Sequence, residues 1–361
     1  MVERSYQDHR RQERPVVQGD GDNSMPSSAA IKLLDLIQSH RTTVVIYVAA
    51  KLGIAELLRD GPRSLDQLAR ATGTYPGALG RLLTALSTVG ICARIAPDGY
   101  SLTDLGLALD GSADESFKAW AIFEGEMLSK SWSGMLETIV TGKTAAQLQG
   151  FENSFELMSR SPEHIGIFNA AMVDLTRLVT PDVLRAFDFS KISHLMDVGG
   201  GSGELIGAIT RQYPRMRGTV FDLPRCKATA QEYLQRVGVS DRAQFVSGNF
   251  FETIPSFADG IILKSVIHDW DDERGSVILR NCHKALPKDG ILLLVERMMP
   301  EMPTTSDVDK AHAMSDLNML RGPGGLERSE HQYRLLLEQS GFGQASLRSA
   351  GRFSVIEARA N

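Results

Sequence analysis

The sequence predicts an α/β protein whose C-terminal half forms a doubly wound parallel sheet and whose N-terminal part is helical. From about residue 188 onward, short apolar strands alternate with amphipathic helices, which is typical of a parallel sheet covered by helices on both faces. Residues 29–110 instead carry helical spacing followed by two extended segments around a turn. With 361 residues, the chain is long enough for two such domains.

Composition narrows the function classes. The hydrophobic fraction of 42% and the charged fraction of 23% are ordinary for a soluble globular protein. The net charge of −5 argues against a broad basic surface for nucleic acid. Cys92, Cys226 and Cys282 show no CxxC spacing, which favours reduced thiols in a cytoplasmic protein over disulfides or a zinc ribbon. No apolar run approaches the ~18 residues that span a bilayer, so no membrane partner is expected.

The N-terminal part reads as a polar tail followed by a winged helix. Residues 1–28 are polar and are interpreted as a disordered tail. Residues 29–110 give helices broken near Gly53, a short helix capped by Ser64, a helix opened by Thr74 and Pro76, and two strands around residues 97–99. The second of these short helices carries a single strong base, whereas a DNA-binding module concentrates basic residues on one face. We therefore interpret the apolar first helices as a homodimer interface.

Residues 111–187 read as a helical connector that contributes to a substrate pocket. Methionine and aromatic side chains recur along it, and each one alone is accounted for by core packing. Together, beside a catalytic domain, they predict a wall for a flat aromatic ligand. The predicted substrate-binding residues are Trp132, Phe155, Phe168, Asn169, Met172 and, further along the chain, Met319.

A glycine loop follows the first strand of the C-terminal region, residues 188–361. It reads DVGGGSG from Asp197 to Gly203 and runs into a helix. The sixth position from Gly199 is Glu204, so the GxGxxG pattern of dinucleotide sites fails, and no GK[ST] of a phosphate-binding loop follows. Asp222, at the end of the next strand, is placed to accept hydrogen bonds from ribose hydroxyls. A nucleoside ligand without phosphates and with a positive charge, such as S-adenosylmethionine, fits these features.

Five motifs occur in order behind the winged helix: DVGGGSG, FDLP, GNFF, LKSVIHDWDDE and GGLERS. This ordered set resembles the S-adenosylmethionine-dependent O-methyltransferases typified by plant caffeic acid and bacterial antibiotic-tailoring enzymes, from about residue 30 to the C-terminus. The resemblance implies a Rossmann-like methyltransferase sheet with a winged-helix dimerisation domain. It also implies S-adenosylmethionine as cosubstrate and S-adenosylhomocysteine as product. The cofactor-binding residues expected on this basis are Asp197, Gly199, Gly201, Asp222, Leu223, Asn249, Phe250, Lys264 and Ser265.

One position departs from the family. An aspartate is usual where this chain has Asn249. The change replaces one hydrogen-bond acceptor by a donor.

The stretch KSVIHDWDDE places His268 at the carboxyl end of a predicted strand, where this fold binds its ligands. Transfer of a methyl group to a phenol requires loss of the phenolic proton, and the pKa of a phenol is near 10. A positioned histidine can accept that proton. The resemblance implies that His268 is the general base and that Glu296 and Glu327 flank it. Asp269 is a further candidate for support of the site.

The acids of the same stretch do not form a convincing metal site. Asp269, Asp271 and Asp272 lack the spacing of an EF-hand and cannot easily converge on one ion. Asp271 and Asp272 are accounted for as the cap and first-turn acids of a following helix. No metal is expected.

The sequence therefore predicts transfer of a methyl group to a phenolic hydroxyl of a small aromatic metabolite, in a homodimer. Two alternatives keep the fold and cofactor: an N-methyltransferase, and a relative that binds S-adenosylmethionine without transferring methyl. A ligand-responsive regulator that uses the winged helix to bind DNA is a third, disfavoured by the weak basic character.

Overall fold

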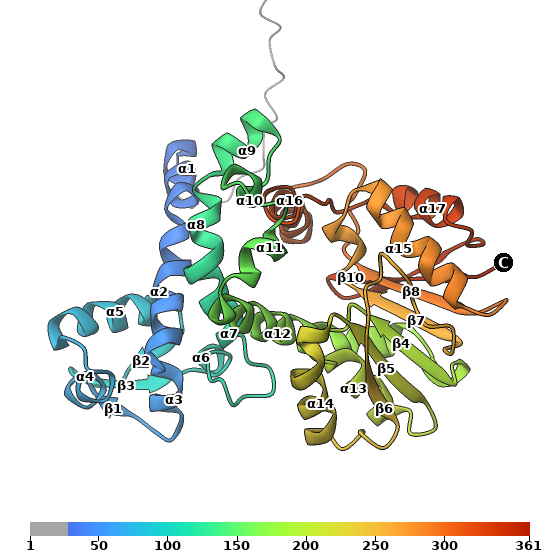
Figure 1. Cartoon of the computed structure of the whole chain (residues 1–361). Coiled ribbons are helices and arrows are strands. Elements are labelled where there is room, and N and C mark those ends of the chain that lie inside the picture. The colour runs from blue at the N-terminus through green and yellow to red at the C-terminus, as the bar shows by residue number, and fades with distance from the viewer. Residues whose placement is uncertain (1–27) are drawn as a thin grey trace, which may run out of the picture. The chain divides into compact units, whose positions relative to one another are not determined.

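The computed structural model describes residues 28–361, so the predicted tail lies outside the described residues except for Ser28. The chain divides between Arg41 and Thr42 into two compact units. Figure 1 labels their helices and strands. Within residues 28–361, no helix combines the length and the apolarity needed to cross a membrane.

The first unit contains α1 (Ala29–Gln38) and the start of α2 (His40–Leu52). Ser28 caps α1 by accepting a hydrogen bond from the backbone N–H of Ile31. None of the α1 residues is buried. Its exposed apolar side chains are those of Ile31, Leu33, Leu34, Leu36 and Ile37. A helix that leaves this much apolar surface exposed normally covers it with another surface.

The second unit begins with the winged-helix pattern that the sequence predicts. Ser64 and Gln67 form a reciprocal capping box, which explains why a helix starts there. The next helix is capped by the backbone of Tyr75, not by Thr74. A three-stranded antiparallel sheet with the order β1-β3-β2 forms the wing. The elements are α3 (Ile54–Arg59), β1 (Arg63–Ser64), α4 (Leu65–Thr72), α5 (Pro76–Thr88), β2 (Cys92–Arg94), β3 (Gly99–Leu102) and α6 (Asp104–Leu107).

A run of helices follows, with one π-helical turn in it. The turn lies where Gly125 packs against the ring of Tyr47 so closely that a Cβ would overlap the ring. The elements are α7 (Lys118–Phe123), the π-turn η1 (Glu124–Leu128), α8 (Ser129–Trp132), α9 (Met135–Thr141), α10 (Ala145–Leu148), α11 (Ser154–Ser159) and the long α12 (Pro162–Ala186). Ser161 caps α12 and Pro162 occupies its first turn.

A seven-stranded sheet forms the rest of the unit, in the order β6-β5-β4-β7-β8-β10-β9. Its strands are β4 (His194–Val198), β5 (Arg217–Asp222), β6 (Ala243–Ser247), β7 (Gly260–Lys264), β8 (Ile291–Glu296), β9 (Ser346–Ala350) and β10 (Phe353–Arg359). The five strands β4 to β8 pair in parallel. The last two differ from the all-parallel expectation, because β9 and β10 form a hairpin and β10 pairs antiparallel with β8. Gly351 in that hairpin has φ 64°, which suits a tight reversal.

Helices cover both faces of this sheet. Along β8, Leu292 and Leu294 join one core cluster and Leu293 and Val295 join the other, because successive strand residues point to opposite faces. The remaining elements are α13 (Glu204–Gln212), α14 (Lys227–Arg236), α15 (Asp272–Ala285), α16 (Asp307–Arg321), α17 (Glu330–Gln339) and the 3-10 turns η2 (Phe189–Lys191), η3 (Pro224–Cys226) and η4 (Ile267–Asp269). The strand order reverses between β4 and β7, which is where sheets of this kind bind ligands.

Candidate active site

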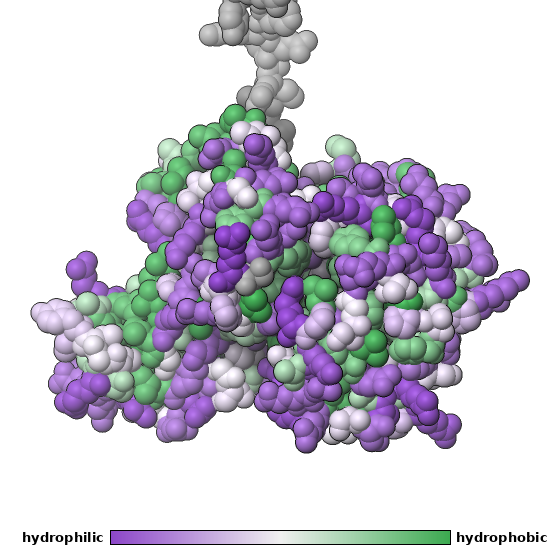
Figure 2. Space-filling model, in the orientation of Figure 1, coloured by the Kyte–Doolittle hydropathy of each residue, from purple (hydrophilic) through white to green (hydrophobic). Residues whose placement is uncertain are grey.

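The predicted site residues converge at the carboxyl ends of neighbouring parallel strands. The glycine loop follows β4, Asp222 ends β5, Lys264 ends β7 and Glu296 ends β8. Hydrophobic residues gather in a hollow near the centre of the face shown in Figure 2.

The glycine loop bends in a way that other residues disfavour. Gly199, Gly201 and Gly203 have φ values of 75°, 55° and 78°, a region that side chains with a Cβ rarely adopt. A Cβ on Gly199 would lie 2.8 Å from Cγ2 of Val266, whereas one on Gly201 would meet nothing within 4 Å. The backbone is therefore bare and open at Gly201, just before the N-terminus of α13, as close approach of a ligand requires.

Asp222 closes the loop from the neighbouring strand. Its Oδ2 accepts a hydrogen bond of 2.8 Å from the N–H of Gly201, and its Oδ1 accepts one of 2.6 Å from the N–H of Leu223. A carboxylate has about four lone-pair positions. Two therefore remain for hydroxyl groups of a ligand.

Two oppositely charged groups lie beneath the loop. Burial raises the pKa of Asp197 to about 7, against the effect of Lys264, and burial lowers the pKa of Lys264 to about 8, against the effects of Glu296 and Asp197. The ammonium group of Lys264 donates to Oγ of Ser265 over 3.3 Å. Ser265 has φ 54°. A non-glycine residue in this region is strained, and such strain clusters at functional sites.

Asn249 makes two local hydrogen bonds. Its Oδ1 accepts from the N–H of Phe251 over 3.0 Å, and its Nδ2 donates to Oε1 of Glu252 over 3.1 Å. An aspartate could make the first bond but would repel Glu252. The asparagine that replaces the family's aspartate thus has an acidic neighbour, Glu252, which accepts a hydrogen bond from its amide. The ring of Phe250 lies on the other side, 3.8 Å from the Cβ position of Gly199.

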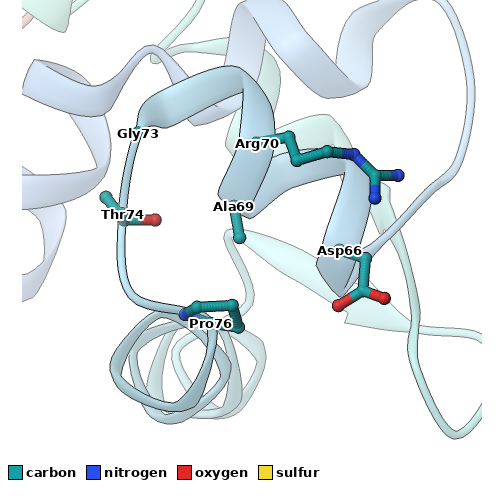
Figure 3. A pocket seen from close by; sticks show the side chains of 6 residues that line it. All are labelled: Asp66, Ala69, Arg70, Gly73, Thr74 and Pro76. Carbon is teal, nitrogen blue, oxygen red and sulfur yellow. The ribbon is translucent and has the colours of Figure 1, made fainter.

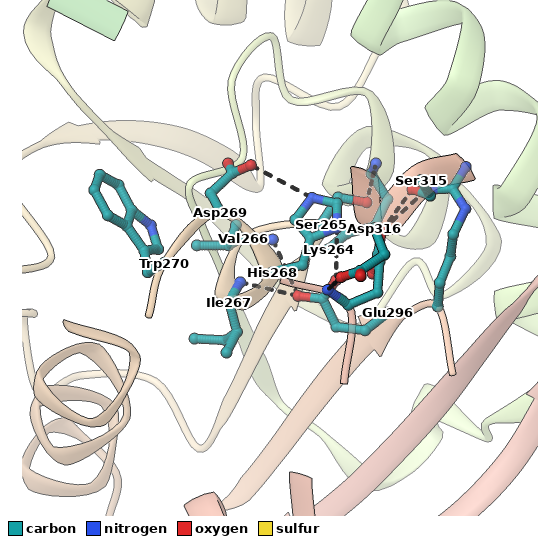
Figure 4. Close-up of polar contacts among 12 residues, drawn as sticks. Lys264, Ser265, Val266, Ile267, His268, Asp269, Trp270, Glu296, Ser315 and Asp316 are labelled. Atoms are coloured by element: carbon teal, nitrogen blue, oxygen red, sulfur yellow. Dashed lines mark hydrogen bonds and ion pairs between the residues drawn. The ribbon is translucent and has the colours of Figure 1, made fainter. Parts of the chain in front are cut away.

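His268 lies buried among three carboxyl groups, with 6% of its surface exposed (Figure 4). Its Nδ1 is 3.1 Å from Oε1 of Glu327 and 3.7 Å from Oε2 of Glu296. Its Nε2 is 3.6 Å from Oδ1 of Asp269. When the imidazole is neutral and Nδ1 donates to Glu327, Nε2 carries the free lone pair.

The charges around the imidazole dominate its protonation. Burial alone would lower the pKa of His268, but the carboxylates of Glu327 and Glu296 raise that pKa to about 9. Burial raises the pKa of Asp269 to about 7 and also raises that of Glu296. Burial would raise the pKa of Glu327, but His268, Ser315 and Arg297 together lower it. His268 is therefore mainly an imidazolium at neutral pH in the unliganded protein.

Each glutamate is fixed by further hydrogen bonds. Oε1 of Glu296 accepts from the N–H groups of Val266 and Ile267 over 3.1 and 2.9 Å. Oε1 of Glu327 also accepts from Oγ of Ser315 over 2.6 Å, and the Glu327 N–H donates to Asp316 over 2.9 Å. Ser315 and Asp316 were not predicted, because they lie on α16 and meet Glu327 only in the tertiary structure.

Arg328 and Gly325 hold the turn that carries His268, and neither was predicted. Arg328 is fully buried and donates to the carbonyls of Ile267 and Trp270 over 3.1 and 2.8 Å. It also donates to Oδ1 of Asp272 over 2.8 Å. A Cβ on Gly325 would overlap the carbonyl oxygen of His268. Arg328 stands beside Glu327 in GGLERS, so the motif itself could have signalled it.

The predicted substrate-binding residues lie on the four helices α8, α11, α12 and α16, and some of them touch one another. Phe155 on α11 contacts Phe168 on α12 with ring centroids 6.3 Å apart and stacks on Trp270 at 6.0 Å. Trp132, Phe168 and Met172 pack on one small apolar cluster. Met319 is buried on α16, and Asn169 lies half-buried beside Phe168 on α12. The aromatic wall, Trp132–Phe168–Phe155–Trp270, thus ends two residues from His268.

Asp271 and Asp272 form the cap and first turn of α15, as the sequence predicts. Oδ1 of Asp271 accepts from the N–H of Arg274 over 2.8 Å, and Asp272 lies in the first turn of α15. A different set could reach one ion: ligand atoms of His268, Glu296 and Glu327 lie within 4.8 Å of one another. Sequence reasoning did not consider this set.

A surface depression lies elsewhere, between α4 and α5 (Figure 3). It is lined by Asp66, Ala69, Arg70, Gly73, Thr74 and Pro76. It contains none of the predicted site residues.

The fold and the site together define a class of group-transfer enzyme. Its features are the winged-helix region, the seven-stranded sheet and the glycine loop at the carboxyl ends of the parallel strands. The family model for the O-methyltransferase domain matches residues 132–343, and the model for the O-methyltransferase dimerisation domain matches residues 34–109. The chain belongs to the O-methyltransferase family and is an S-adenosylmethionine-dependent O-methyltransferase.

Two relatives span nearly the whole chain. The phenazine O-methyltransferase PhzM of Lysobacter antibioticus is 36% identical over 328 residues, covering 91% of this chain and 95% of its own. The 8-amino-8-demethylriboflavin N,N-dimethyltransferase of Streptomyces davaonensis is 29% identical, covering 92% of this chain and 96% of its own.

Solved structures confirm the fold. The crystal structure of LaPhzM superposes with a TM-score of 0.88 and 34% identity, covering 93% of this chain and all of that one. NcsB1, an O-methyltransferase from neocarzinostatin biosynthesis, superposes with a TM-score of 0.73 and 29% identity over 89% of this chain and 96% of its own. That structure holds S-adenosylmethionine and 2-hydroxy-5-methyl naphthoic acid.

Proposed function

We propose that this enzyme transfers the methyl group of S-adenosylmethionine to a phenolic hydroxyl of a small aromatic specialised metabolite, with His268 as the general base. The observation that carries the proposal is the 3.1 Å contact between Nδ1 of His268 and Glu327, which leaves Nε2 free. The aromatic wall ends at Trp270, two residues along the chain from His268. Relatives that act on a phenazine or hold a naphthoic acid support an aromatic acceptor.

His268 takes the phenolic proton on Nε2 while Glu327 and Glu296 stabilise the imidazolium that forms. S-adenosylmethionine supplies an electrophilic methyl group on a positively charged sulfur. A base must be neutral to act, and the pKa of His268 is about 9 without ligands. A cation bound beside the glycine loop disfavours the imidazolium and lowers that pKa toward neutrality. Binding of the charged cosubstrate therefore prepares the base.

The glycine loop and its neighbours supply the cofactor-binding residues of this proposal. Gly199 and Gly201 give close backbone approach, Asp222 accepts from the ribose, and Asn249 and Phe250 border the adenine. Asp197, Leu223, Lys264 and Ser265 complete the set. The open space at Gly201 and the two remaining lone-pair positions on Asp222 support this assignment.

We further propose that the site works without a metal. Oε1 of Glu296 already accepts two backbone N–H groups, and Oε1 of Glu327 accepts from His268 and Ser315. Their Oε2 atoms are buried without a hydrogen-bond partner, but an ion would have to displace the proton that the imidazole of His268 favours. Dialysis against EDTA should leave turnover unchanged. Loss of turnover that returns with a divalent ion would show that His268, Glu296 and Glu327 bind a metal.

The proposed assembly is a homodimer through the N-terminal region. The match of residues 34–109 to the dimerisation model and the exposed apolar face of α1 support it. In this proposal residues 29–110 form the dimerisation domain, 111–187 the connector and 188–361 the cofactor-binding domain.

N-methylation is the second candidate, because one relative is an N,N-dimethyltransferase. An amine acceptor loses a proton more readily after attack and depends less on a base. A screen of matched phenols and aromatic amines, read by release of S-adenosylhomocysteine, separates the two. Methylation of phenols supports the proposal. Methylation of amines alone, or no acceptor-dependent release across phenols, phenazines, naphthoates and quinones, would contradict it.

A further inference from the structure

Arg321, the last residue of α16, is an unusual feature of the helical region. Only 3% of its surface is exposed. Its guanidinium carbon lies 5.3 Å from the centre of the Trp132 ring, and its Nη2 donates to Oδ1 of Asn318. Its Nε is buried and has no hydrogen-bond partner. The planar donor group is thus held in position but is incompletely satisfied.

The charge of Arg321 is also poorly neutralised. Among the described residues it forms no salt bridge, and the acid whose charge acts on it is Glu124 in the π-turn. Burial lowers the pKa of Arg321 to about 10, and burial raises the pKa of Glu124. Arg321 therefore remains charged at neutral pH. A buried charge is costly unless a partner compensates it.

Arg321 stands at the end of the aromatic wall farthest from His268. Trp132, on which it lies, packs on the same cluster as Phe168, and Phe168 leads through Phe155 to Trp270. Ser315, which donates to Glu327, and Arg321 lie on the same helix, six residues apart, or about 9 Å along the helix axis. Two fused aromatic rings have about this length.

We infer that Arg321 binds a carboxylate on the aromatic acceptor, at the end of the molecule opposite the hydroxyl that reacts. This inference rests on the proposed function, because it takes the aromatic wall as the acceptor site. A guanidinium fixed on an indole face offers paired N–H donors in the plane that a carboxylate needs. Its unpaired Nε would then gain a partner. The substrate class is a hydroxylated bicyclic or tricyclic aromatic acid.

The alternative is that Arg321 only packs on Trp132 and Asn318. A purely structural arginine would affect stability but would not distinguish an acid from its neutral amide. Ligand discrimination is therefore the measurement that separates the two.

The experiment measures binding of 2-naphthoate and of 2-naphthamide by calorimetry, with S-adenosylhomocysteine present. Neither compound has a hydroxyl to methylate, so binding is read independently of catalysis. We expect the wild-type enzyme to bind the acid about 10- to 100-fold more tightly than the amide, as for a hydrogen-bonded charge. Arg321→Met should remove this preference and leave the amide affinity unchanged. Arg321→Lys should keep part of it.

Arg211→Met, at an exposed position of α13, is the matched control and should keep the full preference. If Arg321→Met fails to fold, Arg321→Gln gives the same test while keeping donors without charge. A preference that persists in Arg321→Met or Arg321→Gln, or its absence in the wild type, would overturn the inference. Methyl transfer to 6-hydroxy-2-naphthoate is scored separately. Failure of transfer with the binding preference intact would contradict the proposed function alone.

Discussion

Nδ1 of His268 and Oε1 of Glu327 lie 3.1 Å apart although 59 positions separate them in the chain. This contact orients the imidazole through Nδ1 and leaves Nε2 on the side of Asp269, 3.6 Å from its Oδ1. It also brings a full negative charge against a buried ring. Both effects bear on how the enzyme responds to pH.

Glu327→Gln should move the pH dependence of methyl transfer. In the free enzyme the neutral base is the active form, so kcat/KM rises with pH through the pKa of His268, about 9. Removing the Glu327 charge removes a cause that raises this pKa, so the rise should move to lower pH. We expect kcat at its plateau to fall about tenfold or more, because the imidazolium loses support.

Ser315→Ala is the control for that experiment. It removes the hydroxyl that donates to Glu327 but keeps the carboxylate. Its pH profile should stay close to that of the wild type. An unshifted profile in Glu327→Gln would mean that this carboxylate does not set the protonation of the catalytic group.

Arg328→Met should destabilise the protein and reduce turnover. The substitution leaves the carbonyls of Ile267 and Trp270 without a donor, at a cost of about 1–3 kcal/mol for each. Chemical denaturation measures the change. Arg280→Met, at an exposed position of α15, should change stability by less than about 0.5 kcal/mol. Equal stability of the two variants would show that the hydrogen bonds of Arg328 to the carbonyls of Ile267 and Trp270 do not stabilise the folded protein.

Gly325→Ala should impair catalysis more than cofactor binding. The new Cβ would overlap the His268 carbonyl and lie 2.6 Å from the N–H nitrogen of Trp270, so the turn that carries the base must move. A displacement of about 1 Å can cost 10²-fold in rate. The dissociation constant for S-adenosylhomocysteine should change little.

Gly166→Ala provides the comparison, because a Cβ there, inside α12, meets nothing within 4 Å. It should keep full activity and gain about 0.5–1 kcal/mol of stability. Normal turnover in Gly325→Ala would refute the tight packing of GGLERS on the catalytic turn.

The sequence predicts local features of this fold well. Ser64 and Asp271 cap helices where the sequence predicts them. The alternating strands and helices after residue 188 form the expected sheet. The antiparallel β9–β10 pair was not foreseen as such, because apolar strands look alike whichever way they pair.

The same distinction between local and tertiary features holds for the residues of the candidate site. Motif residues such as Asp222 and His268 converge, since the carboxyl ends of parallel strands meet at one edge. Ser315 and Arg328 were missed because their contacts, with Glu327 and with the turn that carries His268, form only when α16 and the 324–329 segment pack in the tertiary structure. No periodicity in the chain reports such contacts.

The central claim is that His268 accepts the proton, and single-turnover methyl transfer by His268→Gln tests it most directly. With saturating S-adenosylmethionine and acceptor, we expect the rate to fall about 10²–10⁴-fold. The pH dependence of the rate that titration of His268 causes in the wild type should disappear. Binding of S-adenosylhomocysteine should be retained. A rate near that of the wild type, with an unchanged pH profile, would contradict the account.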